Sequence, residues 1–153
     1  MNLTQRAECP LKILSCSPEE TFCFGKRIGS FLSCGSVVSL EGELGSGKTC
    51  LAKGIGAALG IKENITSPTY TIINEYSAYE NDLTFFHIDA YRLNSEKEFE
   101  DIGGDEIINS GSICLIEWAG NIKKSLPQSA IAISINITGS ESREITVTGL
   151  DAL

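Results

Sequence analysis

The sequence predicts an α/β fold with a mostly parallel central sheet, flanking helices and antiparallel additions. Three observations lead to this expectation. A short apolar run, a glycine-rich loop and a helical pattern follow one another over residues 37–59. Two further apolar runs each end in a carboxylate, and two nearly alternating segments close the chain. At 153 residues the chain suits a single core, so we expect residues 1–153 to form one domain.

The first expected elements are an edge strand at 11–14 and a capped helix. Ser17 is a good N-cap, Pro18 suits the first turn, and Glu20 stands where a capping box needs it. Gly35 is expected to end this helix. The side chains expected on its buried face are Phe22, Ile28, Phe31 and Leu32.

Residues 42–49, called the phosphate loop below, fit the pattern G-x-x-x-x-G-K-[ST] at every fixed position. An apolar strand precedes the loop and a helix opens at about Gly47, which is the context that a phosphate-binding loop needs. Its glycines let successive N–H groups point toward an anion, and the helix start adds a positive end. Lys48 is expected on the β- and γ-phosphates, and the Thr49 hydroxyl on Mg²⁺. The sequence therefore predicts a nucleotide-binding, P-loop NTPase-like domain. The residues expected to bind the nucleotide here are Glu43, Leu44, Gly45, Ser46, Gly47, Lys48 and Thr49.

The second half of the chain alternates strands with one short helix. Pro68 favours an extended approach to the first of these strands, and residues 79–82 supply a hairpin turn to the second. An acidic helix begins near Asn94 and is expected to break at Gly103–Gly104. The strands are expected at 71–76, 83–89, 112–117, 131–138 and 144–148.

Asp89 and Glu117 each end an apolar strand. Ligands of open parallel sheets bind at the carboxyl ends of the strands, so both side chains are expected near the phosphates. Either one then holds the metal or its water shell, while a helix cap or turn residue is the alternative for one alone. His87, the only histidine, is interpreted as a buried strand residue rather than a general base. Trp118, the only tryptophan, is interpreted as packing, with a contact to the site or a partner as the alternative.

The composition is that of a soluble protein without a basic footprint for nucleic acid. Twelve Lys and Arg against 20 Asp and Glu give a net charge of −8. No apolar run approaches the roughly 20 residues that span a bilayer, and no secretory signal is recognised, so a cytoplasmic location and no membrane contact are expected. None of the six cysteines lies in a C-x-x-C pair, which favours reduced structural thiols. Cys16, Cys23 and Cys114 are interpreted as small hydrophobic residues.

Four stretches together resemble the TsaE (YjeE) family in their order and spacing. They are the phosphate loop, Ser67-Pro68-Thr69-Tyr70, His87-Ile88-Asp89-Ala90-Tyr91-Arg92-Leu93 and Ile116-Glu117-Trp118. The loop alone is unspecific, and the other three make the resemblance specific over nearly the whole chain. The resemblance implies a P-loop α/β fold and the small bacterial ATPase of tRNA threonylcarbamoyladenosine biosynthesis, with ATP and Mg²⁺ as its ligands.

The resemblance also implies roles for individual residues. Lys48 and Thr49 match the phosphate and magnesium positions, and Glu117 matches a second magnesium position. Asp89 matches an acidic residue needed for hydrolysis, so Lys48, Asp89 and Glu117 are the expected catalytic residues. Thr69 falls in a switch-like segment near the γ-phosphate.

Two departures from the family pattern concern the nucleotide. Arg143 matches a basic residue near the nucleotide, but Ser142 precedes it where the family often has glycine. Cys50 stands where the family often has a second hydroxyl residue, so an extra hydroxyl contact to phosphate is in question, while metal binding through Thr49 is unaffected.

The implied activity involves two partner proteins, which install the threonylcarbamoyl group on the adenosine next to the anticodon. This chain would hydrolyse ATP to reset the complex, and tRNA is expected to bind through the partners. Water would attack the γ-phosphate in line, with Lys48, Mg²⁺ and loop amides stabilising the charge. Because no arginine finger or lid is recognised, hydrolysis by the chain alone is expected to be slow.

Two other functions stay open on the sequence. A small-molecule or nucleotide kinase would use the same loop, although kinases usually carry several arginines on a lid and this chain has only single, scattered ones. A GTPase is disfavoured because no N-K-x-D stretch is present. A non-catalytic module, in which ATP occupancy sets the affinity for a partner, shares every motif named above.

Overall fold

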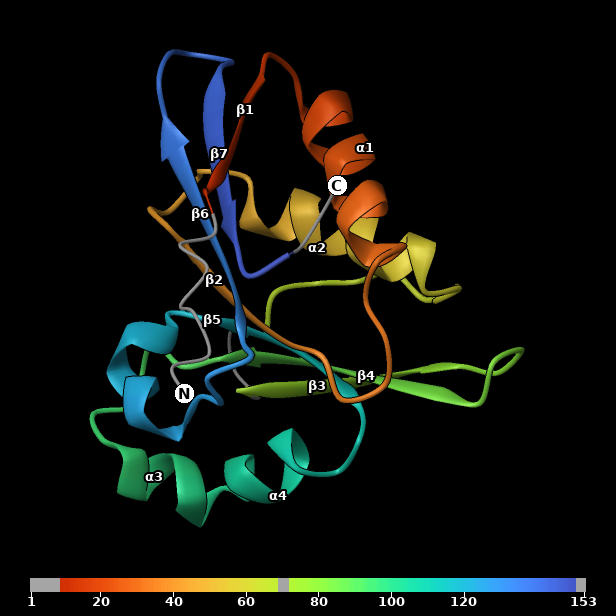
Figure 1. The fold of residues 1–153 in the computed structure, drawn as a ribbon, viewed down its shortest axis with the longest axis vertical. Coiled ribbons are helices and arrows are strands. Elements are labelled where there is room, and N and C mark those ends of the chain that lie inside the picture. The colour runs from red at the N-terminus through yellow and green to blue at the C-terminus, as the bar shows by residue number, and fades with distance from the viewer. Residues whose placement is uncertain (1–8, 69–71, 151–153) are drawn as a thin grey trace, which may run out of the picture.

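The computed structural model describes residues 9–68 and 72–150 as a mixed α/β fold, in which one seven-stranded sheet lies between two groups of helices (Figure 1). The strands are β1 (Leu11–Ser15), β2 (Val37–Gly42), β3 (Ile73–Ala78), β4 (Leu83–Asp89), β5 (Ile113–Glu117), β6 (Ile131–Ile137) and β7 (Arg143–Thr148). The helices are α1 (Pro18–Gly29), α2 (Lys48–Ala58), α3 (Glu96–Asp101), α4 (Gly104–Ile108) and the 3₁₀ helix η1 (Ala119–Ser125).

The strand order is β1-β7-β6-β2-β5-β4-β3. The four central strands, β6, β2, β5 and β4, run parallel to one another. The outer pairs β1–β7, β7–β6 and β3–β4 are antiparallel. The predicted fold class, a mostly parallel central sheet with antiparallel additions, is confirmed. Every residue of β5 is buried, as expected of a parallel strand covered on both faces.

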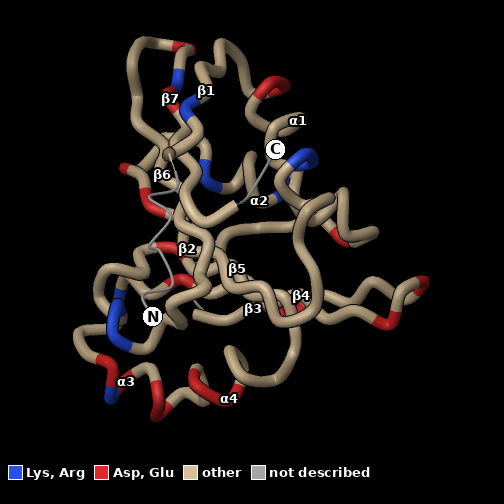
Figure 2. The backbone as a smooth tube through the Cα atoms, viewed as in Figure 1, with Lys and Arg blue, Asp and Glu red and all other residues tan. Residues whose placement is uncertain are grey.

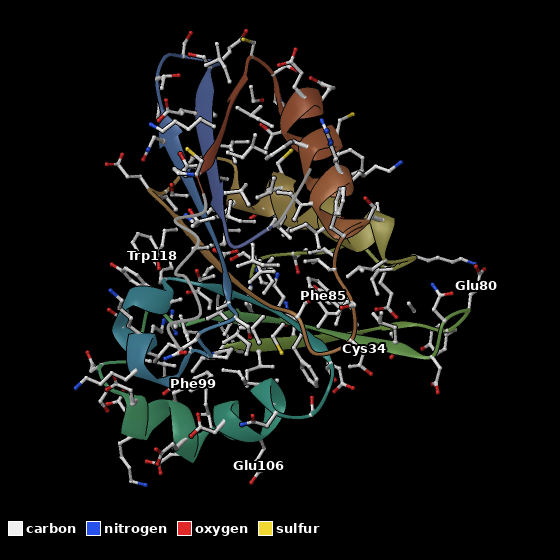
Figure 3. All side chains as sticks on the ribbon, viewed as in Figure 1. Cys34, Glu80, Phe85, Phe99, Glu106 and Trp118 are labelled. Atoms are coloured by element: carbon white, nitrogen blue, oxygen red, sulfur yellow. The ribbon has the colours of Figure 1, made fainter. Side chains whose placement is uncertain are left out.

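Each face of the sheet has its own hydrophobic core, because successive side chains of a strand point to opposite faces. Phe85 lies in the core beneath α1 and α2, together with Leu40, Leu51 and Leu115. Phe99 of α3 lies in the other core, beneath α3, α4 and η1, so the two labelled phenylalanines in Figure 3 mark opposite layers. The alternation also puts His87, Asp89 and Glu117 on the same face as Phe85 and α2.

Glycines allow α1 and α2 to pack closely. A Cβ added at Gly54 would overlap the Phe22 carbonyl oxygen, and one added at Gly25 would overlap the Leu51 carbonyl oxygen. Larger residues at these positions would push the two backbones apart. This contact fixes the position of α2, the helix that begins at the end of the phosphate loop.

The N-terminal helix is shorter than predicted. Ser17 accepts a hydrogen bond from the Glu20 N–H at 3.1 Å, and the Glu20 carboxylate accepts one from the Cys16 N–H at 2.7 Å, so the predicted capping box is present. The helix, however, ends at Gly29 rather than near Gly35. A tighter turn, in which the N–H of Phe31 bonds to the Ile28 carbonyl, directs Phe31 outward, so its predicted burial is wrong.

Three further predictions are modified by the fold. Cys114 is buried, as expected, but Cys16 and Cys23 are exposed because they lie on the outer sides of the chain turn and of α1. Phe22 is only partly buried, since Phe24 and Ile28 take the core side of α1. After the predicted break at Gly103, whose φ of 82° is left-handed, the chain forms a second short helix, α4, that the pattern did not predict.

Acidic residues gather along α3 and α4 and near the tip of the β3–β4 hairpin (Figure 2). Among the residues that the structure describes, none belongs to a helix that is both long and apolar enough to cross a bilayer.

Candidate functional site

The phosphate loop joins the end of β2 to the start of α2, as predicted. Gly45 and Gly47 have φ values of 78° and 105°, a left-handed conformation that L-residues with a Cβ rarely adopt. A Cβ on Gly45 would meet nothing within 4 Å, so glycine is needed there for the backbone conformation rather than for space. Within the loop, the Ser46 side chain is fully buried, and its hydroxyl oxygen has no hydrogen-bond partner among the described residues.

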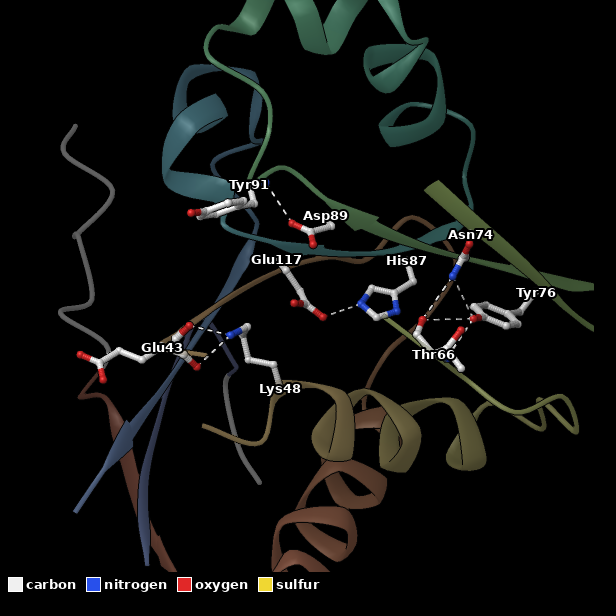
Figure 4. Close-up of polar contacts among 10 residues, drawn as sticks. Glu43, Lys48, Thr66, Asn74, Tyr76, His87, Asp89, Tyr91 and Glu117 are labelled. Carbon is white, nitrogen blue, oxygen red and sulfur yellow. Dashed lines mark hydrogen bonds and ion pairs between the residues drawn. The ribbon is translucent and has the colours of Figure 1, made fainter. Parts of the chain in front are cut away.

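Lys48 lies across the mouth of this loop. Its ammonium group donates hydrogen bonds to the carbonyl oxygens of Gly42 at 2.6 Å and Glu43 at 3.0 Å (Figure 4). The same nitrogen is 5.0 Å from the centre of the Trp118 ring, within cation–π range. Trp118 has a left-handed φ of 55° and its ring packs against Tyr91 at 5.1 Å. Trp118 therefore contacts the site, which was the alternative interpretation from the sequence.

Arg143, at the start of β7, holds the phosphate loop from behind. Its Nε donates to the Ser46 carbonyl at 3.0 Å and its Nη2 to the Gly45 carbonyl at 3.3 Å. Nη1 donates to the carbonyls of Gly139 at 3.1 Å and Ser142 at 2.9 Å. The guanidinium group thus lies on the carbonyl side of the loop, and its expected place near the nucleotide stays a prediction.

The two predicted carboxylates lie side by side at the carboxyl ends of the central strands. Asp89 of β4 and Glu117 of β5 are direct partners in the parallel register. Asp89 accepts a hydrogen bond from the Tyr91 N–H at 2.9 Å. Burial raises the pKa of Asp89 above its usual 3.8; the Tyr91 N–H lowers it, and the nearby charge of Glu117 raises it further.

Glu117 is almost fully buried and is hydrogen-bonded to His87. The distance from His87 Nε2 to Glu117 Oε1 is 2.7 Å, and the His87 side chain has no exposed surface (Figure 4). The sequence interpretation of His87 as a buried strand residue is correct, but it missed this partner. A signal was present: His87 is two residues before Asp89, so both point to the same face of β4.

A cavity of about 770 Å³ lies between the phosphate loop and the carboxylates, a usual size for a small-molecule site. It brings together seven predicted residues: Leu44, Gly45, Gly47, Lys48, Thr49, Asp89 and Glu117. Glu43, Ser46 and Arg143 are not part of its lining. Thr69 lies outside the described residues. The lining residues that the sequence did not indicate as site residues are Cys50, Ser67, Pro68, Ile72, Tyr91, Arg92 and Trp118.

Cys50 lies at the edge of this cavity but its thiol is directed toward α1. Its Sγ donates to the Pro18 carbonyl oxygen at 3.0 Å. Burial raises the pKa of the Cys50 thiol, against the lowering effect of Lys53. The residue that replaces the family's hydroxyl is therefore a neutral thiol bonded to the neighbouring helix.

The segment that precedes Thr69 is fixed to β3. The Tyr76 hydroxyl accepts a hydrogen bond from the Thr66 N–H at 3.2 Å, and Asn74 donates to the Thr66 carbonyl at 3.2 Å. Ser67 and Pro68, which follow directly, line the cavity. The expected switch-like segment is thus preceded by an anchored residue, Thr66, and by two residues of the cavity wall.

The geometry can now be compared with known proteins. The sequence profile described as "Threonylcarbamoyl adenosine biosynthesis protein TsaE" matches residues 15–145. The chain belongs to the TsaE family. A TsaE protein of Treponema pallidum is 41% identical over 137 residues, which cover 90% of this chain and 99% of the relative. A TsaE protein of Bacillus subtilis is 43% identical over 140 residues, covering 92% of this chain and 86% of the relative.

A solved structure supports the fold of this TsaE-family chain. The crystal structure of Bacillus subtilis YdiB matches it with a TM-score of 0.75 at 37% identity, covering 94% of this chain and 87% of YdiB. The printed names of the two relatives refer to tRNA threonylcarbamoyladenosine biosynthesis. The family predicted from four short motifs is therefore confirmed, and with it the pathway of tRNA modification.

Proposed function

We propose that this TsaE-family chain binds ATP with Mg²⁺ and hydrolyses it as a subunit of the tRNA threonylcarbamoyladenosine machinery. The observation that carries the proposal is the position of Lys48 and Thr49 across one cavity from Asp89 and Glu117. A loop that binds phosphate and two carboxylates at neighbouring strand ends are the parts that phosphoryl transfer to water requires.

The residues present fit a nucleotide phosphate. The left-handed glycines at 45 and 47 allow the turned backbone of a phosphate-binding nest, and Lys48 supplies a cation at its mouth. α2 begins at Lys48, so its positive end is directed at the same place. Arg143 holds the carbonyl groups of Ser46 and Gly45 from the opposite side. The loop is thus shaped for an anion before the anion binds.

The residues also fit Mg²⁺ held mainly by the nucleotide. Within the described part of the chain, no group of three or more His, Cys, Asp or Glu could hold a metal by itself. Thr49 and Glu117 both line the cavity and would supply one hydroxyl and one carboxylate oxygen, which suits a magnesium ion that keeps phosphate and water ligands. When bound, Mg²⁺ would neutralise charge on the phosphates.

The chain's own residues then divide the work. Lys48 would leave the loop carbonyls and the Trp118 ring to stabilise charge on the phosphates. One oxygen of Asp89 is held by the Tyr91 N–H, so the carboxylate has a fixed direction from which it can orient the attacking water. Hydrolysis by the chain alone is expected to be slow and to rise with partners, since no lid covers the cavity in the described residues.

The pathway indicates the partners and the place of action. We propose that two partner proteins carry out the threonylcarbamoyl transfer and contact the tRNA, because this chain carries a net charge of −8 and an acidic surface at α3 and α4. ATP turnover would reset that complex in the cytoplasm, where both ATP and tRNA are available.

Steady-state ATP hydrolysis tests the proposal, with the purified chain alone and with the two partner proteins. Wild type, Lys48→Ala and Asp89→Asn are compared. Strong stimulation by partners that is lost in both variants supports an ATPase subunit. Unchanged tRNA modification by Asp89→Asn, despite lost hydrolysis, would instead favour a nucleotide-gated module. A fast rate that depends on an added small acceptor would favour a kinase.

A further inference from the structure

We propose that His87 is a positioning residue for the magnesium site, because it holds the Glu117 carboxylate in the orientation that the metal needs. The inference rests on the proposed function, in which Glu117 faces Mg²⁺ bound with the nucleotide. Neither the family name nor the relatives assign a role to His87. The inference explains how the nearly buried carboxylate of Glu117 keeps one orientation toward the ligand site.

Strand geometry puts the two side chains together. His87 and Asp89 point to the α2 face of β4, and Glu117 points to the same face at the end of β5. Asp89 is the register partner of Glu117, so His87 is its diagonal neighbour one pleat further from the strand end. From there the imidazole reaches forward, and Nε2 lies 2.7 Å from Glu117 Oε1.

The hydrogen-bond pattern determines which nitrogen carries the proton. An ionised carboxylate only accepts hydrogen bonds, so Nε2 must carry the hydrogen that His87 donates to Glu117. His87 Nδ1 is buried and has no hydrogen-bond partner among the described residues. The bond to Glu117 is therefore the described polar contact that fixes the orientation of the ring. His87 acts as a fixed donor.

The imidazole is also held in place mechanically. It has no exposed surface, and the Phe85 ring stacks on it at 6.5 Å between centroids with an interplanar angle of 28°. The Glu117 side chain is only 4% exposed, yet it lines the cavity, and the oxygen that His87 does not contact points away from the imidazole (Figure 4). Holding one oxygen of a buried carboxylate leaves the other directed at the ligand site, as outer-shell donors do in metal sites.

A purely structural role for the pair makes a different prediction. If His87 only satisfies a buried carboxylate, its loss lowers the stability of the fold and leaves the dependence of nucleotide binding on Mg²⁺ unchanged. If His87 positions Glu117, its loss leaves the affinity for metal-free nucleotide unchanged and removes the increase in affinity that Mg²⁺ gives. The comparison of nucleotide affinity with and without the metal separates these two roles.

The experiment measures the Kd of ADP by titration calorimetry, in MgCl₂ and in EDTA. His87→Gln can keep an amide donor near the position of Nε2, whereas His87→Asn is polar but too short to reach Glu117. Ile145→Val, in the same core but on the distant strand β7, is the control for lost packing. Thermal unfolding of each variant sets a temperature at which all are folded.

We expect Mg²⁺ to raise the affinity for ADP by a similar factor in wild type, His87→Gln and Ile145→Val. His87→Asn is expected to bind metal-free ADP within about twofold of wild type and Mg·ADP about 10-fold more weakly or worse, the usual loss on removal of an outer-shell partner. An unchanged Mg²⁺ gain in His87→Asn overturns the positioning role. No Mg²⁺ gain in wild type overturns the magnesium part of the proposed function and this inference with it, while no ADP binding at all overturns nucleotide binding.

A second measurement needs no variant. His87 is the only histidine, so its ring nitrogens give unambiguous signals in a long-range ¹H–¹⁵N spectrum of the wild-type protein. A ring that carries hydrogen on Nε2, both in the free protein and with ADP bound, is the expected result. A ring protonated at Nδ1 alone, or a ring that reorients freely, contradicts the proposal even if His87→Asn fails to fold.

Discussion

Replacing Arg143 with methionine should weaken nucleotide binding although Arg143 does not line the cavity. The guanidinium group donates to the carbonyls of Ser46 and Gly45, and a methionine of similar length donates nothing. When these carbonyls are held from behind, the N–H groups of the same loop face inward. Without the two hydrogen bonds, the loop visits other conformations, and the nucleotide must bind a state that is only partly populated.

The size of the effect follows from the two contacts. A hydrogen bond contributes about 0.5–1.5 kcal/mol net, so the pair contributes roughly 1–3 kcal/mol to the bound conformation of the loop. Since 1.4 kcal/mol is about tenfold in Kd, the full range is about 5- to 150-fold. The bond to Gly45 is solvent-exposed, which puts the expected loss near the lower end, at about tenfold.

Titration calorimetry with ADP measures this loss, and two further variants identify its cause. Arg143→Lys keeps the positive charge but cannot form the two-pronged contact, so it should bind nearly as weakly as Arg143→Met. Lys12→Met removes one positive charge from the neighbouring strand, where Lys12 pairs with Glu144 at the surface, and should bind like wild type. If Arg143→Met binds ADP within twofold of wild type, the hydrogen bonds from Arg143 to the loop carbonyls do not contribute to nucleotide binding. Full rescue by lysine would instead point to direct attraction between Arg143 and the phosphates.

Three further predictions concern stability and reactivity. Asp89→Asn should raise the melting temperature at pH 7, because the raised pKa of Asp89 means that its charge is less favourable in the folded than in the unfolded state. This gain in melting temperature should vanish as the pH falls and Asp89 of the wild-type protein becomes protonated. A lower melting temperature of Asp89→Asn at pH 7 contradicts the prediction. Gly54→Ala should lower the free energy of unfolding, measured in urea, by about 2–3 kcal/mol because the added methyl group overlaps α1. Gly103→Ala should lower it by only about 1 kcal/mol, because Gly103 has a left-handed backbone but open space around it. Equal losses in the two variants would exclude the overlap. Burial raises the pKa of Cys114 to about 11, so at pH 8 only roughly one in a thousand of its thiols is ionised, and a thiol reagent should label Cys34 rapidly but Cys114 only after unfolding.

Local patterns in the sequence were sufficient to predict most of the fold. The phosphate loop needs only its own residues and the flanking strand and helix, and the carboxylates at 89 and 117 follow from where apolar runs end. The hairpin turn before β4 and the cap at Ser17 are also formed by neighbours in the chain. These features depend on residues within a few positions of one another, which is why sequence reasoning finds them.

The contacts that were missed join distant parts of the chain. Arg143 reaches Ser46 across 97 positions, and nothing near Arg143 indicates that its donors meet carbonyls instead of phosphates. His87 meets Glu117 only because β4 and β5 are neighbours, and strand order is not written in the periodicity of either strand. Phe31 is exposed because a tight turn ends α1 where the sequence pattern also allows the helix to continue.

The two separate cores have a consequence for how this protein can vary. The phosphate loop continues into α2, whose apolar side chains belong to the core beneath α1 and α2. The segments that follow β4 and β5, which carry Tyr91 and Trp118 into the site, are anchored in the opposite core by Ala90, Leu93, Ala119 and Ile122. Under the proposed function, substitutions beneath α3 and α4 would therefore shift Tyr91 and Trp118, whereas the helix that follows the phosphate loop would keep its own support from the core beneath α1 and α2.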